Sequence, residues 1–233
     1  MDLDSAKLNA ARAVFEEVGR YEVIGVGTGS TVEKFIELLS KQERFKGKLY
    51  VPSSIDTALK LSERGFRVLN LLSSPEVEVY VDGADEVDPR LNMIKGGGAA
   101  MTMEKILAYY AARRLFIVDY TKLVAKLGEK HPIPVEVLPC ALSPVLKTLH
   151  KMGFRVELRA SGRGKAGPVV ADTGGVVIDV YTGPLDEPEE VNRRLKNIPG
   201  VVETGLFLGY ADAVYIGWPD KVEVLKPSTV IKV

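Results

Sequence analysis

The fold class is decided by residues 22–31, which read Glu-Val-Ile-Gly-Val-Gly-Thr-Gly-Ser-Thr. The apolar start of this stretch predicts a short buried strand, and its glycine-rich end predicts a tight turn. Apolar residues then recur at the spacing of an amphipathic helix: Val32, Phe35, Ile36, Leu38 and Leu39. The stretch therefore predicts a strand, a glycine turn and a helix, the unit from which parallel sheets are built.

The same alternation continues on both sides of this stretch. A helix is expected before it, over residues 5–18. After it, the expected strands cover residues 48–51, 66–68, 77–81 and 115–118, and the expected helices cover residues 53–64 and 101–114. Strands that alternate with helices predict an α/β fold, with a Rossmann-like, mostly parallel sheet and helices on both faces.

The pattern changes near Pro132 and Pro134. Asp172-Thr-Gly-Gly175 is a hairpin signal between apolar runs at 168–171 and 176–180. Helices are expected over residues 143–152 and 186–195, an alternating segment over 154–159, and strands over 201–204, 213–216 and 222–225. We therefore expect a Rossmann-like domain made of residues 1–130 and 207–233. A small α+β, ferredoxin-like domain of residues 131–206 is inserted before the C-terminal strands.

Composition excludes several classes of protein. The 233 residues carry 31 basic and 31 acidic side chains, and this balance argues against a nucleic-acid surface or a polybasic membrane patch. The single cysteine, Cys140, excludes an internal disulfide and is expected to be a small core residue. The sequence shows neither a targeting segment nor a membrane span, so a cytoplasmic protein is expected.

The glycine turn is the first candidate site. Free N–H groups and the helix dipole at the start of the following helix favour an anion near Thr28, Gly29, Ser30 and Thr31. A Walker A loop requires a lysine directly after its last glycine, and no lysine follows Gly29. Ser30 stands where the dinucleotide-binding fingerprint needs a glycine. The turn therefore favours a small phosphate. The alternative is a plain turn with Ser30 as a helix cap.

Acidic residues follow the expected strand at 77–81. Asp82, Gly83, Ala84 and Asp85 stand where ligands bind in open α/β sheets, outside the carboxyl ends of the strands. The spacing of the acids does not match a calcium loop. A solvated acidic turn, and magnesium held by carboxylates together with a substrate phosphate, remain alternatives.

A third candidate is the run Lys95-Gly96-Gly97-Gly98, because consecutive glycines suit the close approach of a ligand or another backbone. Lys95 could stabilise a developing oxyanion, and Glu104 in the next helix could act as a general base. Lys105 is expected to be a surface charge. Lys122 follows the strand at 115–118 and could meet a phosphate.

Taken together, these motifs resemble ribose-5-phosphate isomerase of the A type. The resemblance rests on residues 25–31, 82–86 and 95–100, on Glu104-Lys-Ile106, on Asp119 with Lys122, and on residues 205–207 and 211–212. It covers essentially the whole chain in order. It implies a cofactor-free, metal-independent isomerase that interconverts ribose 5-phosphate and ribulose 5-phosphate, in homodimers or homotetramers.

The resemblance also implies residue roles. Glu104 is the expected base, and the expected substrate contacts are Thr28 to Thr31, Asp82 to Asp85, Lys95 to Gly98, and Lys122. The chemistry agrees, because moving a proton between C1 and C2 needs one base, stabilisation of an enediolate oxygen by Lys95, and polar groups such as Asp82 and Asp85 for ring opening. The other hypotheses are a non-catalytic sugar-phosphate sensor, an acyl-CoA transferase with a glutamate nucleophile, and a deaminase of amino-sugar phosphates.

Overall fold

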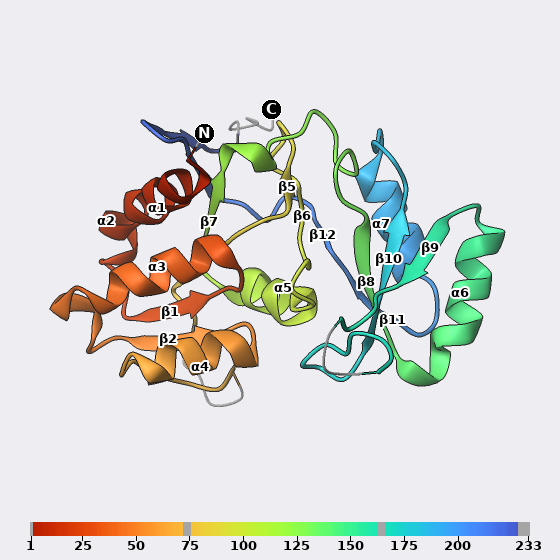
Figure 1. The fold of residues 1–233 in the computed structure, drawn as a ribbon, viewed down its shortest axis with the longest axis horizontal. Coiled ribbons are helices and arrows are strands. Elements are labelled where there is room, and N and C mark those ends of the chain that lie inside the picture. Colours follow the sequence, from red (N-terminus) through yellow and green to blue (C-terminus); the bar gives the residue numbers. More distant parts are fainter. Residues whose placement is uncertain (1, 72–75, 163–165, 228–233) are drawn as a thin grey trace, which may run out of the picture. The chain divides into compact units, whose positions relative to one another are not determined.

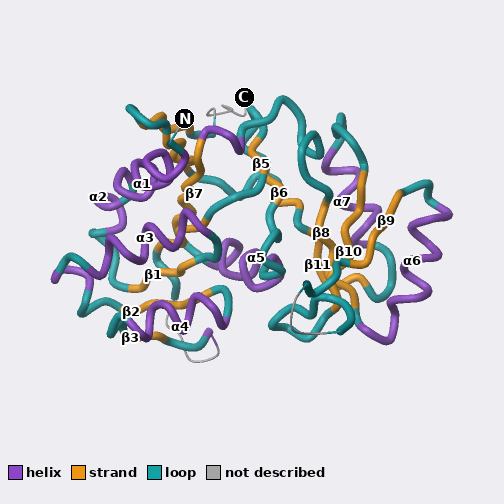
Figure 2. The backbone as a smooth tube through the Cα atoms, viewed as in Figure 1, coloured by secondary structure: helices purple, strands orange, loops and turns teal. Residues whose placement is uncertain are grey.

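The computed structural model describes residues 2–71, 76–162 and 166–227. The chain divides into two compact units, which the ribbon and the tube show with their helices and strands (Figures 1 and 2). The first unit contains Met1–Gly83, Ile106–Lys122 and Gly209–Val233, and the second contains Ala84–Lys105 and Leu123–Leu208. The predicted domain boundaries remain a prediction. The two units differ from them in residues 84–105, 123–130 and 207–208.

The first unit is built on a seven-stranded sheet of order β14-β13-β7-β4-β1-β2-β3. All neighbouring strands are parallel except β13 and β14. The strands are β1 Val23–Val26, β2 Leu49–Pro52, β3 Arg67–Val68, β4 Val79–Asp82, β7 Arg113–Asp119, β13 Ala213–Gly217 and β14 Val222–Leu225. The predicted α/β fold with a mostly parallel sheet is confirmed, including the return of the last two strands to this sheet.

Helices flank this sheet and bury its apolar strands. They are α1 Leu3–Ala13, α2 Phe15–Val18, α3 Ser30–Ser40, α4 Ile55–Glu63 and α5 Met101–Tyr110, with short 3₁₀ turns η1 Glu43–Phe45 and η3 Tyr120–Lys122. Rings of Phe15, Phe35 and Phe45 meet in the core at centroid distances of 5.6 and 5.3 Å. The predicted helix at 101–114 is too long, because it ends at Tyr110 and β7 already begins at Arg113.

The strand order creates a switch point between β1 and β4. The chain leaves β1 toward β2 on one side, whereas β4 lies on the other side, with Val26 opposite Val81. In such sheets the crevice outside the carboxyl ends of these two strands is where ligands bind. The glycine turn after β1 and Asp82 at the end of β4 therefore lie at the edge that the topology favours for a site.

The second unit has a four-stranded antiparallel sheet of order β11-β8-β10-β9. The elements follow one another as β8 Ile133–Val137, α6 Leu142–Lys151, β9 Arg155–Leu158, β10 Val176–Tyr181, α7 Pro188–Lys196 and β11 Val201–Thr204, with the 3₁₀ turn η4 Pro139–Ala141 after β8. This βαββαβ order is that of a ferredoxin-like unit. A second, three-stranded sheet has the order β12-β6-β5, from Leu206–Phe207, Met93–Ile94 and Glu86–Val87.

The second unit contains one strand that the sequence did not predict, and one sequence expectation there is wrong. Strand β8 is not among the predicted strands; Pro134 lies inside it, and proline is unusual in a central strand. The predicted hairpin at Asp172-Thr-Gly-Gly175 is confirmed, because Val170 pairs antiparallel with Val176 and the N–H of Ala171 donates to the Gly175 carbonyl at 2.8 Å, although residues 168–171 form isolated bridges and not a named strand. Cys140 is exposed in η4 and is not a core residue.

Among the described residues, none of the helices combines the length and the apolar character needed to cross a membrane.

Candidate active site

The predicted site residues of the first unit, apart from Lys122, gather at the ends of β1 and β4. We call residues 27–31 together with Asp82 the sheet-edge group. Asp82 is fully buried, and its Oδ1 accepts hydrogen bonds from the N–H groups of Thr28 (3.1 Å) and Gly83 (2.7 Å). Its Oδ2 accepts a hydrogen bond from the Tyr80 hydroxyl. The glycine turn and the acidic end of β4, which are 54 residues apart in sequence, are thus one bonded structure.

Gly27 explains why the turn begins with glycine. A Cβ atom at this position would lie 1.9 Å from Cγ and Oδ1 of Asp82. Only a residue without a side chain lets the buried carboxylate come this close to the backbone. The glycine therefore serves the contact with Asp82, which the sequence reading did not foresee.

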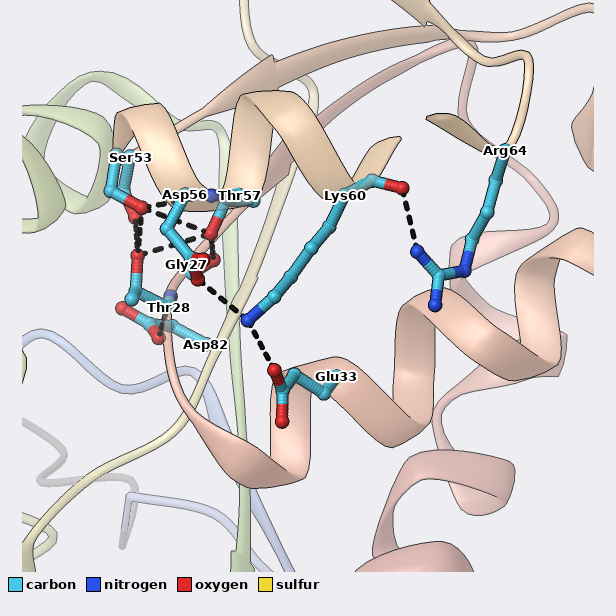
Figure 3. Close-up of polar contacts among 10 residues, drawn as sticks. Gly27, Thr28, Glu33, Ser53, Asp56, Thr57, Lys60, Arg64 and Asp82 are labelled. Carbon is cyan, nitrogen blue, oxygen red and sulfur yellow. Dashed lines mark hydrogen bonds and ion pairs between the residues drawn. The ribbon is translucent and has the colours of Figure 1, made fainter. Parts of the chain in front are cut away.

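Four hydroxyl groups lie side by side next to this turn (Figure 3). The Thr28 hydroxyl lies 2.9 Å from that of Ser53, 2.8 Å from that of Ser54 and 3.1 Å from that of Thr57. Thr57 donates its hydroxyl to the carbonyl of Gly27 at 2.7 Å, and Ser54 caps helix α4. The cluster holds Thr28 against the start of α4, so the orientation of the Thr28 side chain is fixed by residues that the sequence did not single out.

The N-terminus of α3 follows the turn. Gly29 occupies the position before the helix with a φ of 124°, in the left-handed region that favours glycine, and Gly29 and Ser30 are exposed. Lys7 of α1 donates from Nζ to the Ser30 hydroxyl at 2.9 Å. Exposed amides, a helix N-terminus and an ammonium group together form a surface that can accept a phosphate.

Lys122 stands apart from this group. It ends η3, directly after β7, and is half-buried. Among the residues that the structure describes, no hydrogen bond or ion pair joins it to the sheet-edge group. The sequence predicted that Lys122 follows this strand, and the structure adds that the strand lies next to β4.

The predicted site residues of the second unit form the glycine-loop group, which we define as Asp85, Lys95 to Gly98 and Glu104. Lys95 follows β6, and Glu104 lies in the first turn of α5. Lys95 Nζ lies 3.2 Å from Glu104 Oε2, and the two side chains are only 3% and 5% exposed. An ion pair so deeply buried gains strength from the low local dielectric, and its two charges are held in place by each other.

The loop between them has an unusual backbone. Gly96 has a φ of 111°, and a Cβ there would meet Met101 and Pro134 at 3.0 to 3.2 Å. Ala99 is also in the left-handed region, with a φ of 60°. The exposed N–H of Gly97 donates to Asp85 Oδ2 at 2.9 Å. The glycines therefore allow the loop to turn so that the Gly97 N–H can donate to Asp85. Because Gly97 lies two residues after Lys95, this hydrogen bond connects Asp85 to the backbone next to Lys95.

Sequence reasoning missed a second lysine in this region. Lys105 is buried, not on the surface as expected, and donates to the Thr204 carbonyl at 2.7 Å and to Glu203 at 3.0 Å. Its Nζ also lies 4.9 Å from the centre of the Phe207 ring. Burial lowers the pKa of Lys105 to about 8, against the raising effect of Glu203. Burial alone would raise the pKa of Glu203, but Lys105 and other contacts hold it below its usual value.

Two further side chains support the same region. Arg159 donates to the carbonyls of Gly96 (2.7 Å) and Gly97 (3.2 Å). The buried Glu136 accepts hydrogen bonds from Thr102, in the first turn of α5, and from the N–H of Gly175. Each of these contacts joins residues more than 30 positions apart in the sequence, so no local sequence pattern predicts it.

The arrangement offers two kinds of chemistry. The sheet-edge group presents backbone amides, hydroxyls and a helix N-terminus, which suit an anion and sugar hydroxyls. The glycine-loop group presents a carboxylate beside an ammonium group in a dry environment, which suits proton transfer at a carbon next to a carbonyl. Among the described residues, no group of three or more histidine, cysteine, aspartate or glutamate side chains could hold a metal ion.

Known proteins are similar to this chain in both sequence and fold. A family model described as ribose 5-phosphate isomerase A (phosphoriboisomerase A) matches residues 49–221. The ribose-5-phosphate isomerase A of Methanothermobacter thermautotrophicus is 47% identical over 94% of this chain and 96% of its own, and that of Aeropyrum pernix is 46% identical over 89% of each.

Two solved structures cover 97% of this chain and all of their own. The ribose 5-phosphate isomerase A of Methanocaldococcus jannaschii has a TM-score of 0.89 at 38% identity. A D-ribose-5-phosphate isomerase in complex with phospho-erythronic acid has a TM-score of 0.91 at 39% identity. The family match over most of the chain, together with these relatives, shows that the chain belongs to the ribose 5-phosphate isomerase A family.

Proposed function

We propose that this protein interconverts D-ribose 5-phosphate and D-ribulose 5-phosphate through an enediolate. The observation that carries the proposal is the buried pair of Lys95 and Glu104, with 3.2 Å between Nζ and Oε2. The family to which the chain belongs supports the same reaction. A non-catalytic sensor or an acyl-CoA transferase is not favoured by these relatives.

Glu104 is the proposed base. Isomerisation removes the proton from C2 of the open-chain aldose and returns a proton to C1, so one carboxylate that reaches both carbons can serve both steps. As the proton leaves, negative charge grows on the carbonyl oxygen. The ammonium group of Lys95, already held beside Glu104, is the proposed stabiliser of this charge.

Asp82 and Asp85 are proposed to handle the sugar hydroxyls and the opening of the ring. Their carboxylates are oriented by hydrogen bonds from backbone N–H groups, Asp82 by Thr28 and Gly83 and Asp85 by Gly97. A carboxylate held in this way keeps its geometry while it accepts a hydroxyl proton or hydrogen bond. Gly83, Ala84, Gly96 and Gly98 are proposed as backbone contacts of the substrate.

The phosphate is proposed to bind at the start of α3. The exposed residues Gly29 and Ser30 at the helix start, the hydroxyls of Ser30 and Thr31, and the ammonium group of Lys7 support this role. Thr28 and Lys122 are proposed as further contacts. Binding energy from a phosphate distant from the reacting carbons can be used to hold C1 and C2 in place.

The ligand of one structural relative supports the substrate class. Phospho-erythronic acid is a four-carbon sugar acid phosphate, and its planar carboxylate has the shape and charge distribution of an enediolate. We propose that the same features, a phosphate and a planar anionic end, are what this chain recognises. A homodimer or homotetramer and independence of metals and cofactors remain predictions of the family resemblance, and a cytoplasmic location remains a prediction from the sequence.

The test is ribose 5-phosphate with the protein in D₂O containing EDTA, followed by NMR. We expect ribulose 5-phosphate with deuterium at C1, because the enediolate is protonated from solvent-exchanged groups. Binding without turnover would replace the proposal by the sensor hypothesis. Activity that EDTA abolishes and Mg²⁺ restores would contradict independence of metals, and labelling of Glu104 by an acyl-CoA would favour the transferase.

A further inference from the structure

Arg159 is a charged residue of the second unit that the proposed reaction does not use. Its backbone is fixed at both ends, because its N–H donates to the Val177 carbonyl (3.1 Å) and its carbonyl accepts from Val169 (2.8 Å). Its guanidinium pairs with Asp179 of β10 through two hydrogen bonds, and the two side chains are only 18% and 14% exposed. A bidentate pair of this kind sets the orientation of the guanidinium group.

The rest of the guanidinium group is directed at the glycine loop. Its Nη1 donates to the carbonyl of Gly96 at 2.7 Å and to that of Gly97 at 3.2 Å. Pro134, opposite Asp179 in the pairing of β8 with β10, lies 3.2 Å from where a Cβ of Gly96 would be. The sheet therefore supports the loop with one charged contact and one apolar contact.

The peptide group between Gly96 and Gly97 has a charged hydrogen-bond partner at each end. The carbonyl of Gly96 and the N–H of Gly97 belong to the same planar peptide and point in opposite directions. The carbonyl accepts from Arg159, and the N–H donates to Asp85 Oδ2 at 2.9 Å. The peptide therefore stands between a cation and a carboxylate, an arrangement that polarises it and strengthens both hydrogen bonds.

We propose that Arg159 is a positioning residue that orients Asp85 through the peptide between Gly96 and Gly97. Glycine peptides rotate easily, because neither residue has a side chain to restrict φ and ψ. Without the cation, this peptide can turn its carbonyl toward Asp85, whose carboxylate would then lose its donor. The inference rests on the proposed function, since Asp85 matters only if the protein acts on the sugar.

The first experiment measures isomerisation of ribose 5-phosphate by the wild type, Arg159→Ala and the control Arg155→Ala. Arg155 is an exposed arginine of β9 that pairs with Glu157. We expect Arg159→Ala to lower kcat about 10- to 100-fold, the effect of losing a charged hydrogen bond, with KM changed less than threefold. Arg155→Ala should retain the wild-type kcat. Guanidinium ion at millimolar concentration should restore part of the lost rate, and methylammonium should not.

The second experiment is a double-mutant cycle with Asp85→Asn. If Arg159 acts through Asp85, Arg159→Ala should lower kcat by less than twofold in the Asp85→Asn background. An equal loss in both backgrounds would overturn the inference, as would a folded Arg159→Ala variant with normal kcat. If Arg159→Ala does not fold, Arg159→Lys and Asp179→Asn take its place, and both should lower kcat less strongly but depend on Asp85 in the same way. A wild type that does not isomerise the sugar would instead contradict the proposed function.

Discussion

The two groups of site residues are held by different kinds of interaction. In the sheet-edge group, Asp82 and Thr28 are fixed by backbone N–H groups and neutral hydroxyls. In and around the glycine-loop group, the side chains are held in place by buried ion pairs, Lys95 with Glu104 and Lys105 with Glu203. The donors that fix Asp82 and Thr28 are uncharged groups, whereas buried ion pairs depend on the protonation state of both of their members.

This difference suits the proposed division of roles. A phosphate keeps its charge through the reaction, so a rigid arrangement of backbone amides, hydroxyls and the Lys7 ammonium group can bind it unchanged from start to finish. Proton transfer changes charge at the reacting atoms, so groups that can exchange protons or compensate charge must lie there. We therefore expect substitutions in the glycine-loop group to affect kcat and pH dependence, and substitutions in residues 27–31 of the sheet-edge group to affect binding and stability. Substitution of Asp82, which has a proposed part in ring opening, is expected to affect kcat as well.

The largest effect is expected for Glu104→Gln. The amide has the same shape but cannot accept the proton, so kcat should fall about 10²- to 10⁴-fold while the sugar phosphate still binds. NMR rates and calorimetric binding measure the two quantities separately. The control is Glu63→Gln at the exposed end of α4, which should behave like the wild type. Turnover near the wild-type rate in Glu104→Gln would remove this residue from the role of base.

A smaller loss is expected for Lys95→Ala. Removing the ammonium group takes away the charge beside the enediolate oxygen, and kcat should fall about 100-fold with a lesser change in KM. The variant also leaves Glu104 buried without the charge of Lys95, so its melting temperature must be measured to separate folding from catalysis. Lys151→Ala on the exposed surface of α6 is the matched control. A change confined to KM would show that Lys95 binds the ground state and transition state equally.

The comparison also predicts how stability depends on pH. Burial lowers the pKa of Lys105 to about 8, from 10.5 in the unfolded chain. Between these values the unfolded chain binds more protons than the folded protein, so the free energy of unfolding rises with pH. Below pH 8 the lysine is charged in both states, and the cost of burying the charge is present in full.

The measurement is denaturant unfolding of the wild type and Lys105→Met at several pH values from 7 to 10.5. The stability of the wild type relative to this variant should rise by at most about 3 kcal/mol over this range. In the first unit, the pKa of Lys60 is raised through its pairing with Asp56 and Glu33, which outweighs the lowering effect of partial burial. The stability of the wild type relative to Lys60→Met should therefore stay constant between pH 7 and 10. If the free energy of unfolding changed with pH in the same way for the wild type and Lys105→Met, the lowered pKa of Lys105 would be contradicted.

The members of both groups could be predicted from sequence, but the contacts that surround the glycine-loop group could not. The strand before Gly27 and the strand that ends on Asp82 are short apolar runs, and the rule for parallel sheets places their ends together. Arg159 lies 63 residues from Gly96, and Lys105 lies 98 residues from Glu203. Neither pair has a periodic pattern, and a lysine beside a candidate base looks like any surface charge of a helix.

The reason for glycine at position 27 could not be predicted from the sequence, although the turn itself could. The sequence explains this glycine by a turn or a nearby phosphate, whereas the structure explains it by Asp82, whose carboxylate occupies the space of a side chain. The two explanations differ in what Gly27→Ala would do. A methyl group placed only against a ligand would weaken binding and leave stability unchanged, because the free protein would have room for it.

A methyl group placed 1.9 Å from the buried carboxylate must instead displace Asp82 or the turn. We therefore expect Gly27→Ala to lower the free energy of unfolding by about 1–3 kcal/mol, as overpacking does elsewhere, and to raise KM as well. Gly47→Ala is the matched control, because no atom lies within 4 Å of its Cβ position, and it should leave stability unchanged or slightly increased. Unfolding curves for the two variants decide the matter. If Gly27→Ala raised KM at wild-type stability, the glycine would serve the ligand, and the sheet-edge group would depend less on Asp82 than its geometry indicates.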